Sequence, residues 1–152
     1  MENLNKCQTS KALLTEKKIT NNHETSGRHF ILELSGCKAE LLTDVTYIEK
    51  VLKEAVLQAK ATIINSCFYR FKPTGVSGII LLSESHCSIH TWPEERYAAV
   101  DIYTCGKATY PEEACRYLSE ALDPEHTFIS FLERGHKANN SLRFKHSFYN
   151  FH

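Results

Sequence analysis

The sequence feature that constrains the fold most is a run of four β-rich segments, at residues 61–71, 76–83, 85–92 and 96–104. The gaps between the segments are short, and the first gap holds the turn-forming pair of proline and glycine. In the third segment, polar and apolar residues alternate, as they do in a strand whose two faces meet different surroundings. Strands joined in this way are typical of hairpins, so the run predicts an antiparallel sheet.

Two segments outside this run have the apolar spacing of amphipathic helices. The first covers about residues 44–60. The second opens near Thr109, where Glu112 stands three residues further on, the spacing of a capping box. Further strands are predicted at 28–34 and 126–133, so the predicted order is β-α-β-β-β-β-α-β.

This order predicts an α+β fold, a two-layer α/β sandwich in which a mainly antiparallel sheet carries two helices on one face. Two helices can cover only that one face. The other face holds large side chains, among them Trp92 and Tyr97. Because interfaces between chains are enriched in aromatic groups, we expect this face to meet a second sheet in a homodimer.

Length and composition limit the classes of function. The chain has 152 residues, which suits one domain, and we divide it into a flexible extension at 1–26, a folded domain at 27–135 and a tail at 136–152. Lys plus Arg and Asp plus Glu both number 18, and this balance argues against nucleic acid as a partner. No apolar run approaches the roughly 18 residues of a membrane span, and the N-terminus lacks a secretory apolar stretch, so we expect a cytoplasmic protein without membrane partners.

Six cysteines are scattered along the chain, and none forms a CxxC pair. This spacing disfavours a zinc ribbon, and the lack of a secretory signal disfavours a disulfide framework. The default expectation for each cysteine is therefore a small buried side chain.

Residues 75–106 hold most of the chemically reactive side chains. A metal site is one interpretation, because His86 and His90 share a strand face, but the spacing provides no third ligand and we expect no metal. A serine hydrolase is a second interpretation, because Ser85 precedes His86. Against it, neighbouring residues of a strand point to opposite faces, and the segment has no G-x-S-x-G turn.

Self-processing at the bond between Glu84 and Ser85 is the third interpretation. A serine hydroxyl can attack the carbonyl carbon of the preceding residue, which converts the peptide bond into an ester. Elimination of the ester oxygen leaves dehydroalanine, which hydrolyses to a pyruvoyl group. The reaction needs a donor for the attacked carbonyl oxygen and a base near the serine Cα, and Ser77 and His90 are candidates for these roles.

One long motif favours the third interpretation. The run GVSG…SESHxxIHTWPExxYAAVDxxTCG, at residues 75–106, closely resembles the prokaryotic S-adenosylmethionine decarboxylase proenzymes, which depend on a pyruvoyl group. The resemblance extends over about residues 27–135 and includes His29, Phe30, Cys37 and Phe71. It implies an α/β sandwich that pairs with a second copy, sheet against sheet, into an αββα dimer with active sites at the interface.

The resemblance implies that the chain cuts itself between Glu84 and Ser85 into a β chain, residues 1–84, and an α chain, residues 85–152. Ser85 would become the pyruvoyl group, a covalent cofactor made from the chain itself. That group would form a Schiff base with the amine of S-adenosylmethionine and act as the electron sink for its decarboxylation. The product would be the aminopropyl donor for spermidine synthesis.

The same resemblance assigns roles to six further residues. Ser77 and His90 would serve the processing reaction, with His90 as proton acceptor, and Cys105 would be the proton donor in catalysis. The substrate-binding residues would be two aromatic groups that stack on adenine and a carboxylate that holds the ribose hydroxyls, namely Phe71, Trp92 and Glu94.

Two alternatives stay open from the sequence. A relative with the same processing chemistry could act on a free basic amino acid such as ornithine or arginine, since Tyr69 and the pair Glu95-Arg96 depart from the family pattern. A non-catalytic, unprocessed subunit that regulates an active partner is the other alternative. The presence of Ser85 and Cys105 speaks against it.

Overall fold

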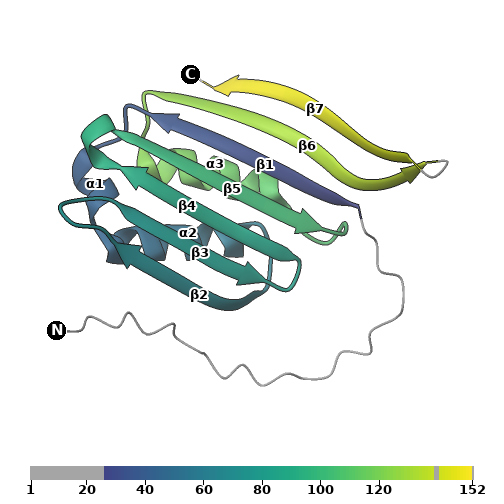
Figure 1. The fold of residues 1–152 in the computed structure, drawn as a ribbon, viewed down its shortest axis with the longest axis horizontal. Coiled ribbons are helices and arrows are strands. Elements are labelled where there is room, and N and C mark those ends of the chain that lie inside the picture. Colours follow the sequence, from purple (N-terminus) through teal and green to yellow (C-terminus); the bar gives the residue numbers. More distant parts are fainter. Residues whose placement is uncertain (1–25, 139–140, 152) are drawn as a thin grey trace.

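The computed structural model describes residues 26–138 and 141–151 (Figure 1). The remainder of the chain, which includes residues 1–25 of the expected extension, lies outside the described residues. The elements are, in chain order, β1 (Gly27–Ser35), α1 (Ala39–Thr43), α2 (Val45–Gln58), β2 (Ile63–Arg70), β3 (Val76–Leu82), β4 (Ser85–Trp92), the short 3₁₀-helix Pro93–Glu95, β5 (Tyr97–Cys105), α3 (Pro111–Leu122), β6 (His126–Ala138) and β7 (Ser141–Phe151).

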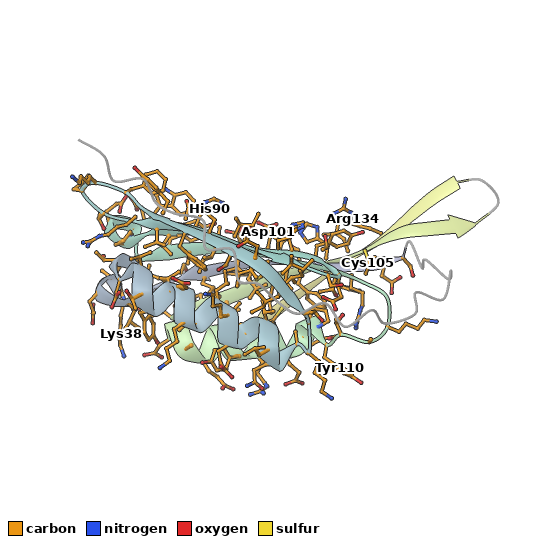
Figure 2. The ribbon with its side chains drawn as sticks, turned by 90° about the horizontal axis from the view of Figure 1, so that it is seen from below. Lys38, His90, Asp101, Cys105, Tyr110 and Arg134 are labelled. Carbon is orange, nitrogen blue, oxygen red and sulfur yellow. The ribbon has the colours of Figure 1, made fainter. Side chains whose placement is uncertain are left out.

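Within the described ranges the strands form one seven-stranded sheet in the order β2-β3-β4-β5-β1-β6-β7. Every neighbouring pair is antiparallel. The strands β2 to β5 follow one another as hairpins, and α2 and α3 pack against one face of the sheet (Figures 1 and 2). The predicted α+β architecture, an antiparallel sheet with two main helices, is therefore confirmed.

The position of β1 could not be taken from the order of the chain. β1 is the first strand, yet it lies between β5 and β6 and pairs with both along its whole length. Gly27 consequently stands opposite Cys105 on one side and opposite Arg134 on the other. This placement brings the start of the folded domain next to the end of β5.

The C-terminal region holds more strand than we expected. The last strand, predicted at 126–133, continues to Ala138 as β6, and β7 pairs with it in the region assigned to a tail. The pairing of β6 with β7 shifts register between Glu133 and His136, and Gly135 lies there at a φ of 78°. A bulge of this kind interrupts the alternation of two residues per repeat, which is the pattern that reveals a strand in a sequence.

Helix α3 also begins differently from the expectation. Thr109 was predicted as the N-cap of a capping box, but Tyr110 occupies the N-cap position without a side-chain cap and Pro111 opens the helix. Proline is favoured at the first helical position because its fixed φ suits a helix. Thr109 is buried instead, and its hydroxyl donates a hydrogen bond of 3.0 Å to Oγ1 of Thr104.

The core lies between the sheet and the helices, and its side chains come from one face of each central strand. Three cysteines, Cys37, Cys87 and Cys115, are buried there, as expected for small apolar side chains. Cys67 is exposed, against that expectation, because it lies on the edge strand β2. The sixth cysteine, Cys7, lies outside the described residues.

Candidate active site

The face of the sheet away from the helices, which we call the open face, carries polar and aromatic side chains (Figure 2). In β4 the residues of this face are partly buried or exposed, whereas the alternate residues Cys87, Ile89 and Thr91 are buried on the helix side of the sheet. Figure 2 shows His90 and Asp101 on the open face. The four residues that sequence alternation placed on one side lie on this face: His86 and Ser88 are partly buried, and His90 and Trp92 are exposed.

A tight turn at residues 83–84 joins β3 to β4 and contains the expected cleavage point. The backbone N–H of Ser83 donates to the carbonyl of Thr62 at 2.9 Å, and the N–H of Thr62 donates to the carboxylate of Glu84 at 2.9 Å. On the other side, the N–H of Cys105 donates to the carbonyl oxygen of Glu84 at 3.0 Å. The carbonyl that would be attacked is therefore held and polarised by a backbone donor.

Ser85 opens β4 directly after this turn and is half-buried. Its Oγ lies 3.1 Å from Nδ1 of His86. The sequence argument that adjacent side chains cannot meet was wrong at this point. It holds inside a regular strand, but Ser85 is the first residue of the strand and borders the turn.

Next to His86 lies a cluster of residues that sequence reasoning did not select. Nε2 of His29 lies 3.1 Å from Oδ1 of Asp101, and Nδ1 of the same ring lies 3.4 Å from Nη1 of Arg134. The Arg134 guanidinium stands over the Tyr103 ring at 4.4 Å. The rings of Tyr103 and His29 lie 5.9 and 6.4 Å from that of His86, between centroids.

These contacts fix the protonation of His29. An arginine N–H can only donate, so Nδ1 of His29 accepts and Nε2 carries the proton that is donated to Asp101. Burial lowers the pKa of His29 and outweighs Asp101, which raises it, while Arg134 and His86 lower it further. Strand alternation could have placed His29 and Asp101 on polar faces. Only the pairing of β1 with β5 shows that they meet, 72 residues apart.

Cys105 ends β5 and is half-exposed at the edge of this cluster (Figure 2). It forms a hydrogen bond with Tyr103, and burial together with this bond raises the pKa of the Tyr103 phenol. The ring of Tyr103 fits because Gly27 lies beneath it: a Cβ at Gly27 would lie 2.6 Å from Cε2 of Tyr103. The Cys105 thiol, which the sequence selected, therefore has an uncharged phenol as its hydrogen-bond partner.

The two residues expected to assist Ser85 lie together but far from it. Oγ of Ser77 and Nδ1 of His90 are 2.7 Å apart, because Ser77 and His90 face each other across β3 and β4. His90 is five residues along β4 from Ser85, which corresponds to about 16 Å of strand. One chain by itself does not bring this pair to the cleavage point.

The expected substrate-binding residues lie at the Ser77–His90 end of the sheet. The Trp92 ring stacks on Tyr97 with centroids 5.3 Å apart and is 41% exposed. Phe71 follows β2, is 47% exposed and donates its N–H to the carbonyl of Gly75. Glu94 lies exposed in the 3₁₀-helix that follows Trp92. The candidate residues thus fall into two groups at opposite ends of β4.

Neither a metal-binding cluster nor a membrane-spanning helix is found among the described residues. Among those residues, no group of three or more His, Cys, Asp or Glu side chains is arranged to hold a metal ion. None of the helices formed by the described residues is long and apolar enough to cross a membrane.

Known proteins match the chain over its folded part. The family model of S-adenosylmethionine decarboxylase matches residues 28–135. The S-adenosylmethionine decarboxylase proenzyme of Moorella thermoacetica is 47% identical over 109 residues, which cover 72% of this chain and 87% of that protein. The proenzyme of the same name from Thermococcus onnurineus is 42% identical over 112 residues, 74% of this chain and 79% of that protein.

Solved structures agree with these matches. The crystal structure of the adenosylmethionine decarboxylase from Aquifex aeolicus superposes with a TM-score of 0.71 at 39% identity, covering 78% of this chain and 98% of that one. The Trypanosoma brucei AdoMetDC monomer, at 14% identity and a TM-score of 0.52, shares the fold over 69% of this chain and 45% of that one. The resemblance found in the sequence is confirmed, and the chain belongs to the S-adenosylmethionine decarboxylase family.

Proposed function

We propose that this S-adenosylmethionine decarboxylase proenzyme cuts its own chain between Glu84 and Ser85 and that the residue-85 end then carries the pyruvoyl group of the active enzyme. One observation carries the proposal: the Glu84 carbonyl accepts a hydrogen bond of 3.0 Å from the N–H of Cys105, while the hydroxyl of the next residue lies 3.1 Å from Nδ1 of His86. A backbone donor aimed at the attacked oxygen is the arrangement that stabilises the charge developing there.

The residues around Ser85 fit a pyruvoyl group. Position 85 is half-buried at the start of β4, and its register partner Thr104 is the neighbour of Cys105. A carbonyl group at this position would be sheltered from bulk water and close to a thiol. When formed, the pyruvoyl group supplies a ketone that takes up the substrate amine and a second carbonyl that receives the electron pair left by carbon dioxide.

Cys105 is the residue we assign to protonation of the substrate carbon. Its side chain lies on the open face, and Tyr103 holds it by a hydrogen bond. A positioned general acid of this kind contributes about 10² to 10⁴ in rate. Because Cys105 acts on the cleavage point through its backbone N–H, its side chain and its main chain have separate roles.

Ser77 and His90 act, in this proposal, on the Ser85 of a second copy. Within one chain they lie about 16 Å along the sheet from Ser85, too far for proton transfer. A twofold dimer whose open faces meet would set the Ser77–His90 end of one copy over the Ser85 end of the other. The same face exposes large apolar side chains, Ile79 at 49% and Leu81 at 50%, which such an interface would cover.

The substrate-binding role of the Ser77–His90 end follows from the same arrangement. Trp92 and Phe71 offer exposed aromatic faces on which an adenine can stack, and a sulfonium cation is attracted to such faces. Glu94 presents a carboxylate two residues from Trp92 that can accept hydrogen bonds from ribose hydroxyls. These features support S-adenosylmethionine over a free basic amino acid.

The mass of the purified chain tests the cleavage. We expect two fragments, residues 1–84 and 85–152, and an increase in the mass of the second fragment after borohydride reduction of its ketone. Ser85→Ala should leave the chain whole. An uncut wild-type chain would instead support the non-catalytic subunit. If the processed enzyme released carbon dioxide from ornithine or arginine but not from S-adenosylmethionine, the result would support the decarboxylase of a basic amino acid.

A mixed dimer tests the second copy. Ser85→Ala and His90→Ala chains are each expected to stay uncut alone. The two chains are then coexpressed with different tags so that they form mixed dimers. In a mixed dimer, His90 of the Ser85→Ala chain should act on Ser85 of the His90→Ala chain, so that the His90→Ala chain is cut. If neither chain is cut in a mixed dimer of verified mass, action across the interface is excluded.

A further inference from the structure

Self-processing requires two separate proton removals. The first takes the proton from the Ser85 hydroxyl so that its oxygen can attack Glu84. The second takes the proton from Cα of residue 85, after the ester has formed, so that the ester oxygen can leave. The Ser77–His90 pair can serve one of these steps from a second copy, but it is far from Ser85 in its own chain.

His86 is the base that already touches the hydroxyl. Its Nδ1 lies 3.1 Å from Oγ of Ser85, within the distance at which a base can abstract a proton. The contact lies within one chain and needs no partner. On the other side of the attacked bond, the N–H of Cys105 lies 3.0 Å from the carbonyl oxygen of Glu84. Base and oxyanion donor therefore flank the same peptide bond.

The neighbours of His86 hold its ring in place. In the sheet, His86 stands between Leu81 of β3 and Tyr103 of β5. The Tyr103 ring meets it edge-on, with centroids 5.9 Å apart and planes at 62°, and the His29 ring lies beyond at 6.4 Å and 71°. A ring packed in this way loses little freedom when it accepts a proton, which is what a preorganised base requires.

We infer that His86 is the catalytic base of the first step, the shift of the Glu84 acyl group from nitrogen to oxygen. Nδ1 of His86 takes the Ser85 hydroxyl proton, and Oγ forms a bond to the Glu84 carbonyl carbon, whose oxygen becomes an oxyanion held by the N–H of Cys105. The carbon–nitrogen bond then breaks, and the nitrogen receives the proton from His86. The result is an ester of Glu84 with the Ser85 oxygen and a free amine on Ser85.

This inference rests on the proposed cleavage at Ser85, and it assigns the two proton removals to two different histidines. His86 forms the ester in its own chain, and His90 of a second copy serves the elimination that follows. Loss of the two histidines should therefore stop processing at two chemically different points. Without His90 the ester should accumulate, whereas without His86 the original amide should remain.

Hydroxylamine distinguishes these two products, because at neutral pH it cuts esters and spares amides. Full-length His86→Asn and His90→Ala chains would be purified, unfolded and treated with hydroxylamine, and the masses of the products would be measured by mass spectrometry. Asn keeps an oxygen that can accept a hydrogen bond from Ser85 but cannot take up a proton. We expect His90→Ala to yield residues 1–84 and 85–152 on treatment, and His86→Asn to stay whole, with its cleavage rate reduced about 100-fold. The double variant should behave as His86→Asn does.

A matched control removes a histidine elsewhere. His126 is exposed at the start of β6 and pairs with Ser35, at the far end of β1 from Gly27, so His126→Ala should be cut at the wild-type rate. His86→Ala provides a second variant, and melting curves establish that both His86 variants are folded. An His86→Asn chain that is cut normally, or that accumulates the ester as His90→Ala does, overturns the assignment of His86. Failure of the wild-type chain to be cut overturns the proposed function itself.

Discussion

The two faces of the sheet are built from the same strands and differ in almost every physical property. On the covered face, which packs on α2 and α3, the side chains are apolar and buried, and Ile80, Ile89 and Val100 are each 0% exposed. On the open face their neighbours along the strands are polar, aromatic or exposed apolar residues, with Trp92 at 41% and Ile79 at 49% exposure. Successive residues of a strand point to opposite faces, so each buried residue of the covered face is followed by a residue of the open face.

Folding and chemistry are therefore assigned to different faces of the sheet. The few polar groups on the covered face are satisfied: the Thr91 hydroxyl donates to the carbonyl of Leu42 and accepts from the N–H of Val76, both at 2.8 Å. In the described residues, no buried side-chain nitrogen or oxygen lacks a partner. The open face instead keeps reactive groups accessible. Substitutions on the covered face should therefore change the free energy of unfolding, whereas substitutions on the open face should change cleavage or turnover.

The largest effect is expected on the open face, at Cys105. Cys105→Ala removes the thiol but keeps the backbone N–H that holds the Glu84 carbonyl, so the chain should still cut itself. Turnover of the processed enzyme should fall by about 10² to 10⁴, the usual contribution of a positioned acid. Intact mass and carbon dioxide release measure the two effects. Loss of cleavage together with turnover would contradict the separate roles of side chain and main chain.

On the covered face, Ile89→Ala should act on stability instead. Ile89 is fully buried between the sheet and the helices, and truncation leaves a cavity. The free energy of unfolding should fall by about 2 to 5 kcal/mol, measured by urea denaturation. The processed fraction of the remaining folded protein should be unchanged. A change in cleavage with no loss of stability would break the distinction between the faces.

Alkaline pH tests the core beneath the covered face through a buried thiol in the connection between β1 and α1. Burial raises the pKa of Cys37 to about 11, above the ordinary value of 9.0. The unfolded chain therefore loses this proton first, so the stability from Cys37 is complete below about pH 9 and is lost as the pH rises to about 11. The loss should approach roughly 2 to 3 kcal/mol. Urea denaturation at several pH values should show this slope in the wild type, and Cys37→Ala should reduce it.

The smallest effect is expected at Trp92, on the rim of the open face. Removal of its ring in Trp92→Ala should raise KM for S-adenosylmethionine about 3- to 10-fold, the size of one aromatic stacking interaction, while the free energy of unfolding changes little. Phe128→Ala is the matched control, because Phe128 is similarly exposed at 48% on the same face. An equal rise of KM in both variants would argue against a specific stacking role for Trp92.

Much of this protein follows from local pattern in the sequence. The hairpin run from β2 to β5, the two long helices and the buried face of β4 were predicted, because alternation, helical spacing and turn residues act over a few neighbours. The long motif around Ser85 also indicated the family and the reactive residues. A bulge at Gly135 interrupted the alternation of β6, so the predicted strand stopped at 133, and β7 was not predicted in the region assigned to a tail.

The tertiary structure alone decided which distant residues meet. The insertion of β1 between β5 and β6 brings His29 to Asp101 and to Arg134, which is 105 residues away in the chain. The extended strand β4 holds His90, and with it Ser77, away from Ser85, although the motif contains all three. The physical reason is that a strand's sequence fixes its two faces, whereas its neighbours depend on how the whole sheet buries its apolar side.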